Sequence, residues 1–277
     1  MNFIVCRTRY WVSLWLIVGV VAVLATSTVN AQILFQDGFE SGNLTHTQNG
    51  IRWAPEGVRT SISSTQVRSG TRSLEFSFEA VPAGQDSFSE HRVTMTSRYT
   101  DLWIMYDLYI PANYYHRPES GANNKFFAIF RDPYPASGYS VNFSTYPNGS
   151  GGSHIEVHYF NNHAEEPYLT PESGRNFITS ADAGRWHNII LHFKVPTGQG
   201  TNDGVMELWK NGSRIVNITN LASWGGSGTN YMDQAYLIGW ANSGYAQQTD
   251  FYVDNFVISD TPLGVNPPGA PGTINVQ

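Results

Sequence analysis

Apolar and polar residues alternate one by one in short segments along most of this chain, which most constrains its fold. Turn residues such as Gly, Asn, Pro and Ser separate these segments, and no long segment follows the helical period of about 3.6 residues. The clearest segments are 73–78, 90–95, 102–110, 125–131, 139–145, 153–159, 186–194, 204–209, 214–218, 236–240 and 251–258. The sequence therefore predicts an all-β fold, an antiparallel sandwich or barrel.

Two of these segments predict a hairpin. Segments 204–209 and 214–218 are joined by Lys210-Asn211-Gly212-Ser213. Asn-Gly accepts the positive φ angles of tight primed turns, so we expect the two strands to pair directly.

The N-terminus has the three parts of a secretory signal. Arg7 and Arg9 precede an apolar run at 11–24, and the small residue Ala31 is placed for cleavage. The run is shorter than the roughly 20 residues that a membrane span needs, although an uncleaved anchor is an alternative. We expect residues 1–31 to be removed and the remainder to be soluble, secreted and extracellular or periplasmic, with no membrane attachment.

The exported part is predicted to be one domain without cysteine. The single cysteine, Cys6, would leave with the signal, so a hydrophobic core must hold residues 32–260 without disulfides. Residues 261–277 are rich in Pro and Gly and predict a disordered tail or linker stub. We expect a monomer.

The charge pattern argues against one class of partner. The chain has a net charge of −6 and no basic run, so nucleic acid is not an expected ligand. An anionic polymer would have to be held by a local basic patch.

The segment Ser153–Tyr159 carries a row of ionisable side chains. His154, Glu156 and His158 fall on one face of the predicted strand, while Ile155 and Val157 fall on the other. A carboxylate between two imidazoles suits proton transfer near neutral pH. The alternative is an ordinary solvated strand face.

Several segments together resemble concanavalin A-like jelly-roll modules, namely 35–42, 70–76, 185–189, 203–212 and 252–256. Ser89-Glu90-His91-Arg92, Tyr99-Thr100-Asp101-Leu102-Trp103 and Asn123-Asn124-Lys125-Phe126-Phe127 are most similar to the heparinase I-like and alginate-lyase-like polysaccharide lyases. The resemblance covers about 33–260. It implies two stacked antiparallel sheets, one bent so that its outer face forms a groove for a sugar chain.

The resemblance implies that the polar sides of five strands line this groove. In 102–110 the outward residues include Trp103 and Asp107; in 125–131 strict alternation groups Lys125 with Phe127, Ile129 and Arg131. The expected groove residues are Glu90, Arg92, Trp103, Asp107, Lys125, Arg131, Ser140, Asn142, His154, Glu156 and His158.

The implied activity is β-elimination next to a uronic acid. The enzyme must neutralise the uronate carboxylate, remove the C5 proton and protonate the leaving oxygen. Arg92, Lys125 and Asn142 are candidates for the first task, His158 or His154 for the second. Tyr245 is the preferred acid, with Tyr139 and Tyr252 as alternatives.

Two family patterns are incomplete here. Glu156 and His158 match the spacing of a glutamine and a histidine in alginate lyases of this fold, and only Glu90-His91-Arg92 remains of an Arg-x-Glu-x-Arg pattern. The predicted substrate-binding residues are Glu90, Trp103, Asp107, Arg131, His154 and Trp240. Trp103 and Trp240 would stack on sugar rings.

Two other functions stay open. A glycoside hydrolase would need a carboxylate pair, such as Glu156 with Glu90 or Asp107. An exported, non-catalytic carbohydrate-binding module of lectin type would fit the incomplete motifs. The resemblance implies no cofactor for catalysis, but a structural Ca²⁺ between Glu40 and Asp254 is expected.

Overall fold

The computed structural model describes residues 32–119, 123–134, 138–161, 164–169, 176–224 and 230–264. They lie in one compact unit, Ala31–Gln277. The regular structure in these ranges is β-strand throughout. The predicted signal at 1–31 lies outside the described residues.

The strands form two antiparallel sheets, which we call sheet A and sheet B. Sheet A has the order β15-β14-β13-β7-β17-β5-β4, with β1 also on β17. Its strands are β1 (Ile33–Asp37), β4 (Thr60–Ser63), β5 (Ser73–Phe78), β7 (Asp101–Ile110), β13 (Arg185–Lys194), β14 (Gly204–Lys210), β15 (Ser213–Leu221) and β17 (Thr249–Ser259).

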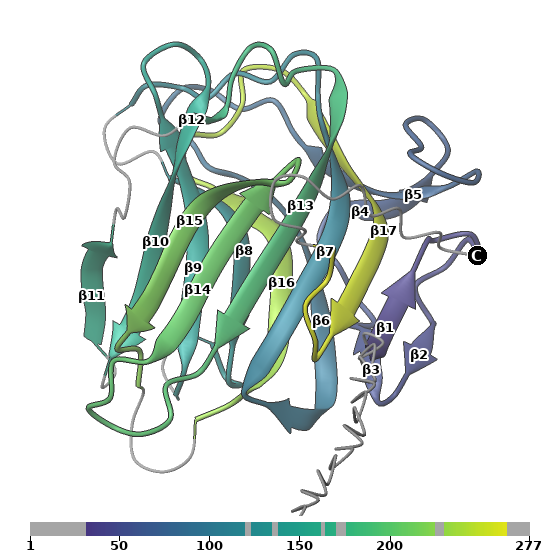
Figure 1. Ribbon diagram of the computed structural model, residues 1–277. Coiled ribbons are helices and arrows are strands. Elements are labelled where there is room, and N and C mark those ends of the chain that lie inside the picture. Colours follow the sequence, from purple (N-terminus) through teal and green to yellow (C-terminus); the bar gives the residue numbers. More distant parts are fainter. Residues whose placement is uncertain are drawn as a thin grey trace, which may run out of the picture. The chain divides into compact units, whose positions relative to one another are not determined.

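Sheet B has the order β11-β10-β9-β8-β16-β6-β3-β2, with β12 also on β10. Its strands are β2 (Thr47–Gln48), β3 (Ile51–Trp53), β6 (Ser87–Tyr99), β8 (Asn124–Phe130), β9 (Ser140–Pro147), β10 (Ser153–Asn161), β11 (Ala164–Leu169), β12 (Asn176–Ile178) and β16 (Met232–Ala241). Figure 1 shows the two sheets as stacked layers, with β14, β13 and β7 in front of β9, β8 and β16. The predicted sandwich is confirmed.

The core lies between the sheets and is built by the alternation read from the sequence. On β7, the side chains of Leu102, Ile104, Tyr106, Leu108 and Ile110 are all buried in it. The inner faces of sheet B contribute in the same way, for example Val141 and Phe143 of β9 and Ile155 and Val157 of β10.

The predicted hairpin is confirmed. β14 and β15 pair antiparallel, with Lys210 opposite Ser213. Asn211 and Gly212 have φ angles of 51° and 76°, as a primed turn requires.

The chain continues onto sheet A after β17, which corrects the predicted start of the tail. Leu263 is 1% exposed and packs with Trp103, Ile190 and Val257 on the outer face of this sheet. The expected disordered segment therefore begins too early at 261, and its remainder, 265–277, lies outside the described residues. No helix long and apolar enough to cross a membrane occurs in the part of the chain that the structure describes.

Candidate active site

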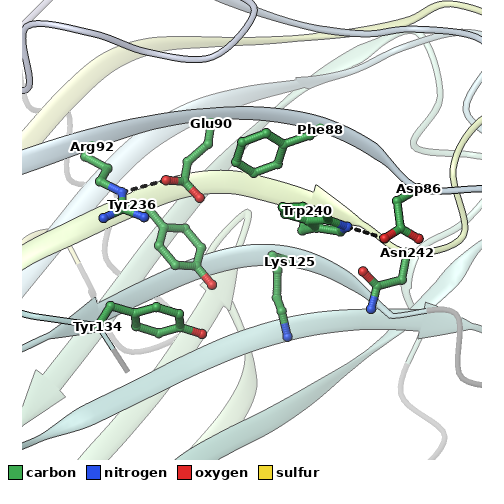
Figure 2. Close-up of a pocket in the computed structure, with 9 residues that line it drawn as sticks. All are labelled: Asp86, Phe88, Glu90, Arg92, Lys125, Tyr134, Tyr236, Trp240 and Asn242. Atoms are coloured by element: carbon green, nitrogen blue, oxygen red, sulfur yellow. Dashed lines mark hydrogen bonds and ion pairs between the residues drawn. The ribbon is translucent and has the colours of Figure 1, made fainter. Parts of the chain in front are cut away.

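A cavity of about 470 Å³ opens on the outer face of sheet B. This volume falls within the range of small-molecule sites, about 300–1,000 Å³. The central strands β6, β16 and β8, which are neighbours in the sheet, supply most of its walls. The lining residues are Asp86, Phe88, Glu90, Arg92, Lys125, Tyr134, Tyr236, Trp240 and Asn242 (Figure 2).

Lys125 reaches this cavity because of an irregularity in β8. The register of β8 against β9 shifts between Lys125 and Phe127, so one extra residue is inserted there. Phe126 and Phe127 both turn into the core, and Lys125 shares the outer face with Ala128 and Phe130. The expected grouping of Lys125 with Phe127 and Ile129 is therefore wrong, although Lys125 does face outward.

The floor of the cavity contains a strained stretch of β16. Ile238 has a φ of 58° and Gly239 a φ of 133°, and positive φ is rare for a β-branched residue. A Cβ at Gly239 would lie 3.3 Å from Glu90 Oε2 and 3.3 Å from the Lys125 Cβ. Glycine thus allows Glu90 and Lys125 to approach the same strand, and stored strain of this kind marks functional sites.

Glu90 and Arg92 form an ion pair at one side of the cavity. Both residues face outward from β6, as predicted, and Arg92 Nε donates to Glu90 Oε1 at 2.6 Å. Of the two side chains, Glu90 is 11% exposed and Arg92 is 42% exposed. This contact uses Nε, and the two terminal nitrogens of the guanidinium lie on the Tyr236 side in Figure 2.

Two tyrosines beside this pair were missed by the sequence prediction. Tyr236 of β16 and Tyr134 line the cavity, and their rings meet edge to face at 5.7 Å. Burial raises the pKa of Tyr236 well above its ordinary value, so its hydroxyl keeps its proton at neutral pH. Tyr236 and Trp240 are four residues apart on one strand, so alternation places both on the same face. The sequence therefore contained the information that Tyr236 faces outward with Trp240.

Trp240 stands at the opposite end of the cavity. Its side chain is 45% exposed, its Nε1 donates to Asp86 Oδ2 at 2.5 Å, and its ring lies 4.8 Å from that of Phe88. An exposed indole held in this way is available for stacking on a sugar ring, which stays a prediction. Figure 2 shows Arg92 and Tyr236 at one end of the cavity, Trp240 and Asp86 at the other, and Lys125 between them.

The ionisable row of β10 lies on the same face of sheet B, beyond this cavity. The register aligns Arg92 with Tyr236, Tyr236 with Ala128, Ala128 with Asn142 and Asn142 with His158, across five strands. A second row aligns Lys125 with Ser144 and Ser144 with Glu156. The predicted neighbourhood of β6, β8, β9 and β10 is therefore present.

Two side chains of the β10 row pair with each other, and His158 contacts a tyrosine on β9. His154 Nε2 lies 2.9 Å from Glu156 Oε1, and His158 Nε2 lies 3.3 Å from the hydroxyl of Tyr146, another tyrosine that the sequence prediction missed. His158 and Asn142 are each only 1% exposed. In the described part of the chain, none of His154, Glu156, His158 and Asn142 lines the cavity.

Trp103 and Asp107 do not belong to this face, which corrects their predicted place in the groove. Both lie on β7, which is in sheet A. Trp103 stacks on His192 at 4.0 Å and is 8% exposed, while Asp107 accepts a hydrogen bond from Asn255 at 2.8 Å. Their outward direction was correct, but the alternation carried no information on which sheet holds the strand.

The preferred acid, Tyr245, is also corrected. It is 3% exposed, and its ring packs against Phe78 and Phe251 inside the sandwich. Of the alternatives, Tyr139 is fully buried in the core, and Tyr252 donates to Glu75 on sheet A. None of the three tyrosines lines the cavity.

Arg131 is likewise absent from the cavity lining. Its guanidinium lies 5.0 Å from the ring centre of Tyr231, which Arg98 also contacts at 4.5 Å. Because β8 ends at Phe130, Arg131 follows the turn to this cluster at the end of the sheet.

Glu40 and Asp254 do not fit a shared calcium ion. Glu40 accepts hydrogen bonds from the backbone N–H groups of Thr71 and Arg72, and Asp254 accepts them from Arg68 and Ser69. Burial raises the pKa of Asp254 even though these hydrogen bonds oppose the shift. The two carboxylates hold the segment 68–72 from separate places, and N–H donors occupy the oxygens that a cation would need. Within the described ranges, no group of three or more His, Cys, Asp or Glu side chains is placed to hold a metal.

An open cavity lined by aromatic and charged side chains is a candidate binding site for a small molecule or for part of a polymer. The sequence matches the family described as "Polysaccharide lyase" over residues 39–237. The chain therefore belongs to the polysaccharide lyase family, and it is an enzyme of the lyase class. The matched range includes Glu90, Arg92, Lys125 and Tyr236 and ends before Trp240.

Solved structures share the fold at low sequence identity. Alginate lyase vAL-1 from Chlorella virus is 13% identical with a TM-score of 0.58, covering 82% of this chain and 99% of its own. A variant of alginate lyase Aly36B in complex with alginate trisaccharide is 14% identical with a TM-score of 0.53, covering 73% and 86%. The cellulose-induced protein Cip1 is 16% identical with a TM-score of 0.51, covering 83% and 99%. No curated protein matched the sequence significantly.

Proposed function

We propose that this protein cleaves a uronate-containing polysaccharide by β-elimination in the cavity on sheet B. The observation that carries the proposal is the convergence of Arg92, Lys125 and Tyr236 on one cavity of this lyase-family chain. This elimination requires a cation for the uronate carboxylate, a base for the C5 proton and an acid for the leaving oxygen, and these three side chains can supply them. The alginate complexes of Aly36B, a protein of the same fold, are consistent with an acidic substrate.

The proposed mechanism divides the reaction among three side chains. The terminal nitrogens of Arg92 bind the uronate carboxylate and neutralise its charge. Glu90 holds the guanidinium in place through Nε. Lys125, in its uncharged form, takes the C5 proton. The C4–O4 bond breaks, a C4–C5 double bond forms, and Tyr236 gives its proton to the leaving oxygen.

The proposed base differs from the histidine expected from the sequence, and the reason is physical. A base must reach the proton that it removes, and Lys125 lines the cavity whereas His158 does not. His158 lies on β10 and Tyr146 on β9, so β8 separates them from β16 and β6, which carry most of the cavity lining. We propose that they contact the polymer where it extends beyond the cavity.

The direct test is product formation. The purified protein is incubated with alginate, glucuronan and heparin, and the ultraviolet absorbance of an unsaturated uronide is followed. We expect this signal with at least one polymer and its loss in Arg92→Ala. Polymer binding without any absorbance change would indicate a non-catalytic module instead.

Export is part of the proposal. The basic and apolar N-terminus supports cleavage after Ala31 and secretion. We propose that the exported protein is a monomer that needs no cofactor for catalysis. N-terminal sequencing of protein recovered outside the cytoplasm should begin at Gln32, and light scattering should give the monomer mass. Retention of residues 1–31 in a membrane fraction would contradict cleavage.

A further inference from the structure

The charged side chains are unevenly distributed along the cavity. Arg92, which is paired with Glu90, and Tyr236 occupy one end, Lys125 lies in the middle, and Asp86 lies at the other end with Trp240 and Asn242 (Figure 2). An acidic polymer that lies in the cavity would place one sugar against the Arg92 end and another against the Asp86 end. The second position has an unfavourable field for another carboxylate.

The Asp86 end has the features of a sugar subsite. Among the described residues, Val58, Tyr115 and Trp240 are the large hydrophobic side chains that are exposed, and of these Trp240 alone lines the cavity. The hydrogen bond to Asp86 at 2.5 Å and the ring of Phe88 at 4.8 Å fix the indole before a ligand arrives. A preorganised aromatic face loses little entropy on stacking.

Asp86 adds a chemical preference to this platform. A carboxylate is an acceptor for sugar hydroxyl groups but repels a second carboxylate. Asn242 beside it is held by Asn123, to which its Nδ2 donates at 2.6 Å. The environment next to Trp240 therefore favours an uncharged, hydroxyl-rich ring.

We infer that Asp86 and Trp240 form a subsite for a neutral sugar, so that the substrate is a heteropolymer that contains both uronates and uncharged residues. This inference rests on the proposed function, because it assigns the uronate to the Arg92 end. It names Asp86 as a specificity-determining residue for the polymer.

The first experiment measures kcat/KM of the wild-type protein and of Asp86→Asn. The substrates are two polymers made only of uronates, glucuronan and alginate, and two polymers that alternate glucuronate with an uncharged N-acetylhexosamine, hyaluronan and heparosan. Removing the charge should raise kcat/KM on an all-uronate polymer relative to an alternating polymer by about tenfold. An unchanged ratio would overturn the subsite while leaving the lyase activity in place.

The second experiment tests the subsite without turnover. Calorimetry compares cellotetraose, a neutral β-1,4-linked tetrasaccharide, in the wild-type protein, Trp240→Ala and Arg92→Ala. We expect Trp240→Ala to weaken cellotetraose binding about tenfold or more and Arg92→Ala to leave it within about twofold. If no polymer is cleaved but this pattern holds, the proposed activity fails and the subsite stands. If Trp240→Ala leaves the affinity for cellotetraose unchanged, or if the wild-type protein does not bind cellotetraose, the proposed subsite is wrong.

Discussion

Lys125 is the residue whose chemistry most directly separates the possible roles in the cavity. As the base, Lys125 must lose and regain a proton, which an arginine does not do near neutral pH. Lys125→Ala and Lys125→Arg should therefore both lower kcat by about 10²–10⁴-fold. The measurement is initial rate from product absorbance at saturating polymer.

The Arg variant is the informative control. If Lys125 only neutralises the substrate carboxylate, Lys125→Arg keeps most of the activity while Lys125→Ala does not. His158→Ala, on the same face but buried, should reduce kcat less than either variant. A larger loss of kcat in His158→Ala would indicate that His158 of β10 is the base.

Gly239 is a second residue whose substitution has a predictable effect. At Gly239→Ala the new Cβ meets Glu90 Oε2 and the Lys125 Cβ at 3.3 Å, and the backbone keeps a φ of 133°. We expect a cost of about 1–3 kcal/mol in the free energy of unfolding, with a reduced kcat/KM. Gly212→Ala is the matched control, since its φ is 76° and no atom lies within 4 Å of the added Cβ. Equal losses of activity in both variants would argue against crowding of the cavity.

At the scale of elements, His192 links three strands of sheet A. It lies on β13 between Asp101 of β7 and Glu207 of β14, with each ring nitrogen 2.9 Å from a carboxylate oxygen. Burial alone would lower the pKa of His192, but the hydrogen bonds and charges of Asp101 and Glu207 outweigh it and raise the pKa. The protonated imidazole can donate to both carboxylates.

The sign of the resulting pH dependence follows from the raised pKa. The stabilisation is complete below the unfolded value, about 6.5, and disappears as the pH rises through the higher folded value. The melting temperature of His192→Gln should therefore fall furthest below that of the wild type near pH 5 and approach it near about pH 9. A difference that is constant with pH would contradict the charged state of His192.

The alternation of apolar and polar residues predicts a strand correctly where its period of two is unbroken, and fails where a residue is inserted. Segment 73–78 is strand β5 residue for residue, because nothing interrupts its period. β8 has an inserted residue that inverts the faces after Lys125, and no turn residue in the sequence marks it. Tyr245 lies outside any periodic segment, so its burial was not readable.

Strand neighbours are a further limit on prediction from the sequence. The outward faces of β6 and β7 look alike in the sequence, although the strands are joined by one residue and enter different sheets. Glu90 and Arg92 were therefore placed correctly, whereas Trp103 and Asp107 were assigned to the wrong surface. The chemistry of single residues was readable, but their meeting across strands required the register.

At the scale of the whole molecule, Asp37 and Trp53 connect the two sheets. Asp37 of β1 is 9% exposed and accepts hydrogen bonds from Trp53 Nε1 of β3 at 2.8 Å and from the Phe39 N–H at 2.7 Å. Asp37→Ala leaves both buried donors unpaired, at a cost of about 1–3 kcal/mol each. Thermal unfolding should show a melting temperature several degrees lower, with kcat unchanged.

The control for this prediction is Asp260→Ala, which removes an exposed carboxylate beyond β17. Trp53→Phe keeps a ring in the core and removes the donor, so the double variant should cost less than the sum of the single ones. Full additivity would indicate that the two side chains do not stabilise each other.

Leu263 fixes the end of the described chain to the outer face of sheet A. Leu263 packs on sheet A, whereas the cavity opens on sheet B, so a group attached directly after residue 264 starts on the face opposite the cavity. A bead coupled at that position, in a protein shortened to residue 264, would leave the cavity facing a gel or cell wall.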